Sequence, residues 1–324
     1  MTKPKQKFFK FFFQKNIVKR KIREVIKEDK GEKDSLLNDF KIKSQAAMEY
    51  LMTYGWAILI IALTLAVLYS LGIMNPKNFL PRSPPGSCFV FRPNGPGTTD
   101  FVSLQGTCGY LPMYVASFNG VNGYINCGNN TNLKLYDKSF TLQAWIKPAT
   151  NIPTGSRFTV LAYYNPGWIM DLPDDSNVEG YRFYNGSIDY KYAPPSGLVS
   201  LEWTQFVVVR DLSTNTLSIY LNGNIKQSWS MRLVGNSPNP LLIGRRTDGY
   251  YFNGFISNVQ IYNTALTPQE IQYLYQQGLG GGPIRLGSLV GWWPLNGDAK
   301  DYSGNNNHGT INGGVTFVQN YNPP

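Results

Sequence analysis

The longest uninterrupted apolar stretch of the chain runs from Tyr50 to Met74, YLMTYGWAILIIALTLAVLYSLGIM, and holds no charged residue. As a helix these residues extend about 37 Å, enough to cross a hydrocarbon layer of about 30 Å. A cleaved secretory signal would be shorter and would end in a small-x-small site, whereas this run continues into Asn75-Pro76, which ends a helix. The pattern predicts one transmembrane helix, within residues 45–74, that stays in the mature protein.

Beyond this helix, residues 75–87 are rich in proline and predict a semi-rigid spacer. From there onward, short runs of β-branched and aromatic residues alternate with Asn, Gly and Pro turns, a spacing typical of an antiparallel sandwich. The expected strands are 140–146, 159–163, 181–184, 205–210, 217–221 (followed by Asn222-Gly223), 241–244 and 255–262.

One helix is expected among these strands, over residues 268–276. Thr267 is placed to cap it, Pro268 occupies the first turn, and Glu270 is at the position that closes a capping box.

The positive charge is concentrated at the N-terminus. Residues 1–44 contain 14 lysines and arginines but six aspartates and glutamates, out of 30 and 20 in the whole chain. Such a tail just before an apolar run indicates that it stays in the cytoplasm. Nucleic-acid binding is not expected, because it would need basic residues on a folded face. Residues 1–44 therefore form a basic cytoplasmic leader, either an amphipathic helix on the inner leaflet or a disordered tail.

The junction KIKSQAAMEYLMTYGWAI resembles an archaeal class III signal peptide, the leader of type IV pilin-like subunits. The resemblance implies that a prepilin-type leader peptidase cuts between Ser44 and Gln45. Glu49 would then be the fifth mature residue, where pilin-like subunits carry a glutamate that pairs with a neighbouring subunit's N-terminal amine. The alternative is an ordinary charge at the lipid boundary. The leader is long and the domain large, so a membrane-retained protein and a filament component both remain open.

A series of motifs resembles a laminin-G-like domain: ASFNGVNGYINCGNN, SFTLQAWIKP, WTQFVVVRD, STNTLSIYLNG, LLIGRR, YFNGFISNVQIYNTAL and TPQEIQYLY. The resemblance implies a mainly β fold, a jelly-roll sandwich of the laminin-G/concanavalin type, over residues 88–324. Residues 289–318 normally begin such a domain but here end the chain. A circular permutation would dock them beside residues 117–124 and complete the sandwich, whereas a truncated second repeat would be unstable.

The segment DYSGNNNHG lies, in relatives of this kind, near a structural calcium. Its candidate oxygen ligands are Asp301, Asn305 and Asn307. Relatives often have an acid pair where this chain has Ser257 and Asn258, which removes two anionic oxygens. No cofactor is required, and the alternatives are a bound Ca²⁺ or a metal-free turn held by hydrogen bonds.

No enzyme is expected. His308 is the single histidine, so a zinc cluster or a catalytic triad would depend on it alone. Four acidic residues cluster in MDLPDDSNVEG, in what we expect to be a surface loop interrupted by proline: Asp171, Asp174, Asp175 and Glu179. Paired carboxylates hydrolyse glycosides in other proteins, but a solvated loop is the simpler interpretation.

Carbohydrate recognition is the functional hypothesis, because exposed aromatic rings stack on sugar faces while polar side chains bind hydroxyls. The loop-adjacent candidates are Tyr163, Tyr164, Trp168, Tyr250 and Tyr251.

Three cysteines follow the apolar run. We expect a disulfide between Cys88 and Cys108, with Cys127 buried or free. Asn129 and Asn185 begin N-glycosylation sequons, NNT and NGS.

The sequence thus favours a non-enzymatic archaeal surface protein for adhesion or glycan recognition, with the N-terminus cytoplasmic and the domain outside the cell. Its expected partners are the membrane, the leader peptidase, pilin-like subunits or copies of itself, and surface glycans. A structural envelope or filament subunit, or an accessory to a glycan-processing enzyme, are the alternatives.

Overall fold

The structure is a computed structural model and divides into two units, Met1–Asn75 and Pro76–Pro324, which we treat separately. The residues that it describes are Arg20, Lys43, Met48, Glu49, Met52 and the ranges 54–70, 87–109, 111–164, 166–175, 177–231 and 235–319. Ser44 and Gln45, the expected processing site, lie outside the described residues.

Residues 54–70 of the first unit form a helix with exposed apolar side chains, including Leu59 and Ile60. The hydroxyls of Thr64 and Ser70 donate to backbone carbonyls one turn earlier, at 2.8 and 2.9 Å, so these polar groups are satisfied within the helix. Glu49 is also helical and exposed. Within the described residues no helix combines the length and the apolar character needed to cross a membrane. The transmembrane helix stays a prediction.

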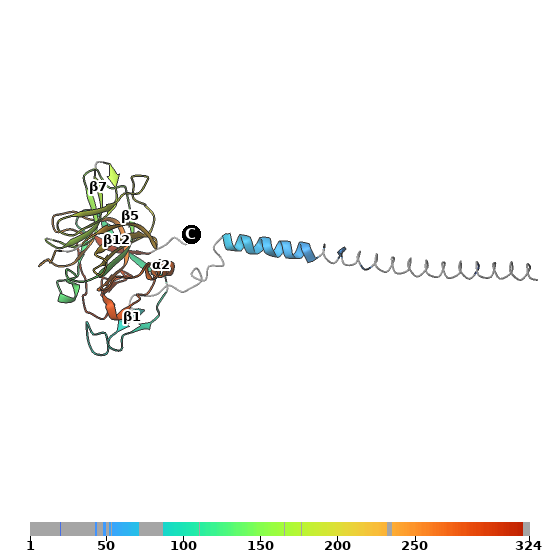
Figure 1. The fold of residues 1–324 in the computed structure, drawn as a ribbon, viewed down its shortest axis with the longest axis horizontal. Coiled ribbons are helices and arrows are strands. Elements are labelled where there is room, and N and C mark those ends of the chain that lie inside the picture. The colour runs from blue at the N-terminus through green and yellow to red at the C-terminus, as the bar shows by residue number, and fades with distance from the viewer. Residues whose placement is uncertain are drawn as a thin grey trace, which may run out of the picture. The chain divides into compact units, whose positions relative to one another are not determined.

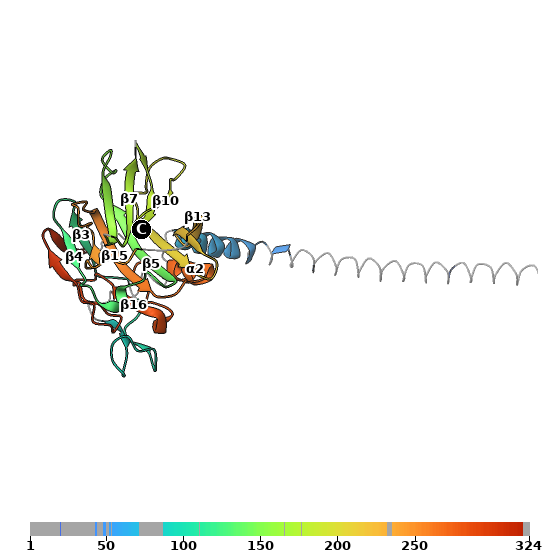
Figure 2. The same cartoon turned by 60° about the vertical axis from the view of Figure 1, so that its left-hand side comes forward.

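The second unit is mainly β and contains two large antiparallel sheets (Figures 1 and 2). We call the sheet of order β10-β9-β7-β6-β14-β4-β17 the first sheet; β8 pairs with its strand β7. Its strands are β4 (Tyr124–Asn126), β6 (Arg157–Tyr163), β7 (Trp168–Asp175), β8 (Val178–Glu179), β9 (Tyr181–Tyr184), β10 (Asp189–Tyr192), β14 (Leu242–Ile243) and β17 (Thr310–Asn312).

The second sheet has the order β13-β12-β11-β5-β15-β3-β18, and β16 pairs with β15. Its strands are β3 (Tyr114–Asn119), β5 (Phe140–Pro148), β11 (Thr204–Asp211), β12 (Thr216–Leu221), β13 (Asn224–Ser230), β15 (Asn253–Tyr262), β16 (Leu289–Trp293) and β18 (Val315–Gln319). Every strand pairing in both sheets is antiparallel. The predicted sandwich is therefore confirmed.

The main core lies between the two sheets. Along β11, Phe206 and Val208 point into it, while Val207 and Val209 belong to a second apolar cluster on the opposite face. This strand is buried on both faces, which explains its continuous apolar sequence, since a strand with one face in water would alternate.

Helix α2 (Pro268–Gln277) contributes to that second cluster through Ile271 and Leu274. Its capping box is present in full: Thr267 accepts from the backbone N–H of Glu270, and the Glu270 side chain accepts from the backbone N–H of Thr267. The predicted helix and its cap are confirmed. Two short 3₁₀ turns complete the elements, η2 (Thr131–Leu133) and η3 (Leu286–Ser288).

The C-terminal segment completes both sheets. Thr316 of β18 lies opposite Ser117 of β3, and Asn312 of β17 lies opposite Tyr124 of β4. Figure 2 shows these red strands at the sheet edge beside β4. The segment docks where the permuted arrangement requires it to dock.

A small hairpin of β1 (Cys88–Phe91) and β2 (Ser103–Gly106) precedes the sandwich. The disulfide between Cys88 and Cys108 is confirmed, and Cys127 is free and buried, with a pKa that burial raises well above its usual value. Arg92, also buried, donates to the carbonyls of Ser303 and Leu289 at 2.8 and 2.7 Å, so it fastens the hairpin to the C-terminal segment.

Candidate functional site

The β14–β15 connection folds into a tight hairpin loop, residues 245–251, of sequence RRTDGYY. Its ends are joined by a β-bridge between Arg245 and Tyr251. The N–H of Arg246 donates to the Tyr250 carbonyl at 2.9 Å, and Gly249 supplies the positive φ of 98° that the turn needs. This backbone presents two consecutive arginines and two consecutive tyrosines in a defined arrangement.

Arg246 lies against two tyrosine rings. Its guanidinium carbon is 4.5 Å from the ring centre of Tyr250 and 5.2 Å from that of Tyr164, which follows β6. Both distances are typical of cation–π contacts. Arg246 also pairs with Asp248 in the same loop. Burial lowers the pKa of Arg246, but the hydrogen bond and charge of Asp248 outweigh burial and the net pKa is raised. This cation therefore has its counter-ion within the loop.

Arg245 is stacked in the same way on a different pair of rings. Its guanidinium carbon is 4.6 Å from the ring centre of Tyr124 on β4 and 5.3 Å from that of Tyr251. We call Tyr124, Tyr164, Arg245, Arg246, Tyr250 and Tyr251 the Arg–Tyr cluster. All six residues are partly exposed, although the Nε–H of Arg245 is itself buried.

The cluster lies on the outer face of the first sheet, beside a buried ion pair. Arg182 on β9 donates to both carboxylate oxygens of Asp171 on β7, at 2.8 and 2.6 Å, and to Asp189 at 2.6 Å. The charges of Asp171 and Arg182 act on the pKa of Arg246 in opposite directions, which places the pair near the cluster. Tyr184 extends the aromatic surface, with its ring centre 6.3 Å from that of Tyr164.

The acidic segment is not the surface loop that we expected. Asp171 is 0 % and Glu179 1 % exposed, and both lie on strands, β7 and β8. Burial is tolerated because Asp171 pairs with Arg182, while Glu179 accepts from the backbone N–H groups of Ile152 and Val199 at 2.7 and 2.8 Å. These carboxylates hold the strand and its neighbouring loops in place.

Two of the five aromatic candidates lie in the core instead of on the surface. Tyr163 and Trp168 are each 1 % exposed, and Trp168 stacks on Phe140 and Phe183 with ring centres 6.4 and 6.3 Å apart. Successive residues of a strand point to opposite faces, so Tyr163 points inward where its neighbour Tyr164 points outward. Tyr164, Tyr250 and Tyr251 are the three candidates that the fold brings together.

The residues proposed for calcium are saturated by hydrogen bonds. The two carboxylate oxygens of Asp301 accept from the backbone N–H groups of Trp292, Ser303 and Asn307, at 2.8–2.9 Å, and from the Ser303 hydroxyl. A calcium ion needs oxygens whose lone pairs are available, and here N–H donors already occupy them.

The other two proposed ligands are engaged as well. The side-chain oxygen of Asn305 accepts from the Gly97 N–H, and that of Asn307 accepts from Asn130. The described residues contain no group of three or more His, Cys, Asp or Glu side chains suited to a metal. This turn fits a hydrogen-bonded structural element better than a cation site, and His308 joins it by accepting from the Asp301 N–H.

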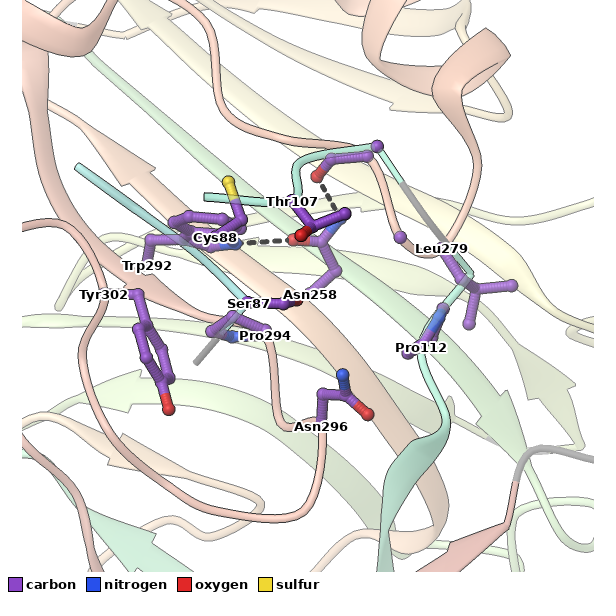
Figure 3. Close-up of a pocket in the computed structure, with 13 residues that line it drawn as sticks. Ser87, Cys88, Thr107, Pro112, Asn258, Leu279, Trp292, Pro294, Asn296 and Tyr302 are labelled. Atoms are coloured by element: carbon purple, nitrogen blue, oxygen red, sulfur yellow. Dashed lines mark hydrogen bonds between the residues drawn. The ribbon is translucent and has the colours of Figure 1, made fainter. Parts of the chain in front are cut away.

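A small pocket lies between the disulfide hairpin and the sandwich (Figure 3). Within it Asn258 accepts from the indole N–H of Trp292 at 2.8 Å and donates to the Gly281 carbonyl at 3.0 Å. The pocket has a volume of about 40 Å³, which admits water-sized groups but no sugar ring. Asn258 is thus a structural residue that holds Trp292.

The two sequons differ in accessibility. Asn129 is exposed, although its side chain accepts from the Tyr163 hydroxyl and donates to the Pro238 carbonyl. Asn185 is 9 % exposed, and its side-chain oxygen accepts from the N–H groups of Ser187 and Ile188 in a tight turn. The structure therefore disfavours Asn185 as an acceptor, because its amide lies inside the fold.

Sequence reasoning missed both arginines of the cluster, together with Tyr124, Tyr184 and Arg182. The available signal was local: an Arg-Arg pair directly after the strand LLIG and before the turn TDGYY. No local signal indicated that side chains of β4 and β9 lie beside this loop, because these strands are more than sixty residues away from it in the sequence.

Residues 119–272 match the family model described as the concanavalin A-like lectin/glucanases superfamily. Among solved structures, one from Bacteroides ovatus, described as a carbohydrate binding protein, is 20 % identical with a TM-score of 0.51. That match covers 67 % of this chain and 63 % of the other, so the chain spans less than two thirds of its length.

A pentraxin from Limulus polyphemus is 16 % identical with a TM-score of 0.48, covering 64 % of this chain and 95 % of the pentraxin. No curated protein matches the sequence. The family match and the Bacteroides ovatus structure support a concanavalin A-like sandwich as the fold.

Proposed function

We propose that this chain, whose second unit is a concanavalin A-like domain, is a non-enzymatic cell-surface protein that recognises glycans through the Arg–Tyr cluster. One observation carries the proposal. A single hairpin loop and two neighbouring segments hold four tyrosine rings around two guanidinium groups on the outer face of the first sheet.

Such a surface suits the chemistry of a sugar. The apolar face of a pyranose ring packs on an aromatic ring, while guanidinium and phenol groups bind the hydroxyls around its edge. The rings are already fixed by their contacts with the arginines, so a ligand would order few side chains on binding. The Arg182–Asp171 pair beneath the cluster is buried and adds rigidity.

The absence of catalysis is part of the proposal. Hydrolysis of a glycosidic bond requires two carboxyl groups that face the substrate. Asp171 is bound to Arg182 through both oxygens, and Asp248 is paired with Arg246, so the carboxylates of the described residues nearest the cluster are committed to arginines.

Anchoring at the cell surface completes the proposal. Its support is the sequence: a basic leader, a Ser44-Gln45 junction with Glu49 at the fifth following position, and an apolar run beginning at Tyr50. In this arrangement the leader is cytoplasmic and the sandwich is displayed outside the cell, on the membrane or in a filament.

Binding of the full chain, purified in detergent, to an array of plant, microbial and animal polysaccharides tests the glycan proposal. Tyr250→Ala should weaken binding to any positive glycan about tenfold, which corresponds to roughly 1.4 kcal/mol, because a stacking face is lost. Tyr273→Ala is the matched control, since Tyr273 lies on α2 and is 54 % exposed.

The control variant should bind as the unaltered chain does. Equal loss in both variants, or no binding to any glycan, would overturn the proposal and favour the alternative of a structural envelope subunit.

A further inference from the structure

The two arginines of the cluster differ in their counter-ions. Arg246 pairs with Asp248, and nearby Arg182 pairs with Asp171 and Asp189. Arg245, by contrast, lies within ion-pair distance of no carboxylate in the part of the chain that the structure describes. It is a partly buried cation whose charge is balanced only by the faces of Tyr124 and Tyr251.

Arg245 also has an unused donor. Its Nε–H is buried and has no hydrogen-bond partner among the residues that the structure describes. Buried donors are almost always paired in folded proteins, and each one left unpaired costs about 1–3 kcal/mol. Stacking on a ring engages the face of a guanidinium and leaves its N–H groups free in the plane, where an anion can accept from two of them at once.

A second unpartnered polar group lies next to it. The hydroxyl of Thr159 is buried without a partner, and this residue is 0 % exposed. Its strand neighbour Val160 accepts from the N–H of Gly244, so Thr159 and Arg245 flank the same backbone hydrogen bond. Thr159 is in register with Asp171, and cross-strand partners project from the same face. The hydroxyl therefore lies on the face that carries the cluster.

We infer that Arg245 is an anion subsite and that the ligand is an acidic glycan, in which a carboxylate borne by the sugar accepts from the guanidinium fork. Tyr124 and Tyr251 would flank the ring that bears this group. The inference rests on the proposed function and narrows it to one substrate class. Residues 45–324 hold 16 basic and 14 acidic residues and are nearly neutral, so their overall charge does not explain such a preference, and the positive charge of residues 1–44 is the same in every variant tested below.

A matched pair of polymers tests the inference: polygalacturonate, which carries free carboxylates, and its fully methyl-esterified form, in which the same sugar is uncharged. The full chain in detergent should bind the acid at least tenfold more tightly than the ester, and added salt should reduce this difference. Dextran sulfate against dextran forms a second pair and shows whether sulfate replaces carboxylate.

Three variants test whether Arg245 is responsible for the preference for the acid over the ester. Arg245→Gln removes the charge and should abolish most of the preference for the acid over the ester. Arg245→Lys keeps the charge without the planar fork and should retain only part of the preference. Lys226→Gln removes one positive charge from β13 on the second sheet and should leave the preference intact. The thermal midpoint of each variant shows that it is folded.

The outcomes separate the two proposals. Equal binding of acid and ester by the unaltered chain, or equal loss in Lys226→Gln and Arg245→Gln, overturns the acidic-glycan inference and leaves glycan recognition standing. Binding to none of the four polymers and to no glycan of the array overturns both.

Discussion

Arg182 is an enclosed charged residue of the outer face, with a side chain that is 5 % exposed. Burial lowers its pKa, but the charge and hydrogen bonds of Asp171 outweigh burial and raise the pKa above its ordinary value. The guanidinium thus remains charged at every accessible pH and depends on its two partners, Asp171 and Asp189, to offset desolvation.

Asp171→Asn should destabilise the domain by about 3 kcal/mol or more, because it leaves a charge buried without its main counter-ion. Asp189→Asn is the matched control: its carboxylate contacts the same arginine but is 56 % exposed, and the expected loss is about 1 kcal/mol or less. Denaturant unfolding of the two variants measures both values. Similar losses in the two would contradict this account of the pair.

Asn258 has a structural role in the packing of Trp292. Its backbone has a φ of 48°, which asparagine tolerates better than most residues, and its side chain joins Trp292 to the loop at Gly281. The amide both donates and accepts, so the position serves packing.

At the scale of elements, helix α2 depends on its first turn. Glu270 closes the capping box and also pairs with Arg285, which precedes η3. Burial raises its pKa, but the hydrogen bonds from Arg285 and Thr267 outweigh burial, so the net pKa is lowered. A lowered pKa means that this stabilisation is complete above the unfolded value of about 4.3 and is lost as pH falls through the folded pKa.

Glu270→Gln should therefore cost about 1 kcal/mol at pH 7, and the gap from the unaltered chain should narrow as the pH falls below the unfolded value and through the lowered folded pKa. Glu202→Gln serves as control, because Glu202 is 83 % exposed and pairs only with Lys147 at 3.3 Å. Chemical unfolding at a series of pH values provides the comparison. A gap that stays constant across the whole acid series would show that charge is not what Glu270 contributes.

The strand β13 was not expected, and neither were β7 and β10. β13 reads NIKQSWS and is exposed along almost its whole length, so it lacks the apolar alternation by which strands are recognised. β13 forms because the Asn222-Gly223 turn brings it alongside the edge of β12, with which it pairs. The turn and the neighbouring strand therefore determine this element, and its own apolar pattern does not.

At the scale of the whole molecule, the second unit is a domain in which early and late segments of the chain meet in one sandwich. The domain tolerates this order because β17 and β18 pair with β4 and β3, so the C-terminal segment is a full part of both sheets. The segment that leads into the domain is tied down separately, by Arg92 and by the Cys88–Cys108 disulfide.

The leader hypothesis predicts that the mature protein in membranes or shed filaments begins at Gln45. Ser44→Phe should block processing, because the cut requires a small residue at that position, whereas Ser35→Phe makes the same change within the leader and should not. N-terminal sequencing of the three proteins provides the measurement. Retention of Met1 in the unaltered protein would make the chain an ordinary single-span anchor.

Local sequence patterns determined much of the fold of this protein. The sandwich, the capped helix α2, the disulfide and the docking of the C-terminal segment follow from turn residues, caps, cysteine placement and motif order, which act over short stretches of sequence. Three of the five aromatic candidates, Tyr164, Tyr250 and Tyr251, lie in the Arg–Tyr cluster. The sequence indicated them because they flank recognisable turns.

Tertiary structure alone decided which groups face one another. Tyr163 points into the core and Tyr164 out of it because the registers of β6 and β7 assign the faces. Asp171 is buried because Arg182 arrives from the next strand, and Arg245 is left without a carboxylate because β4 brings it a tyrosine. Such pairings depend on which strands lie side by side and in which register, and no local pattern encodes them.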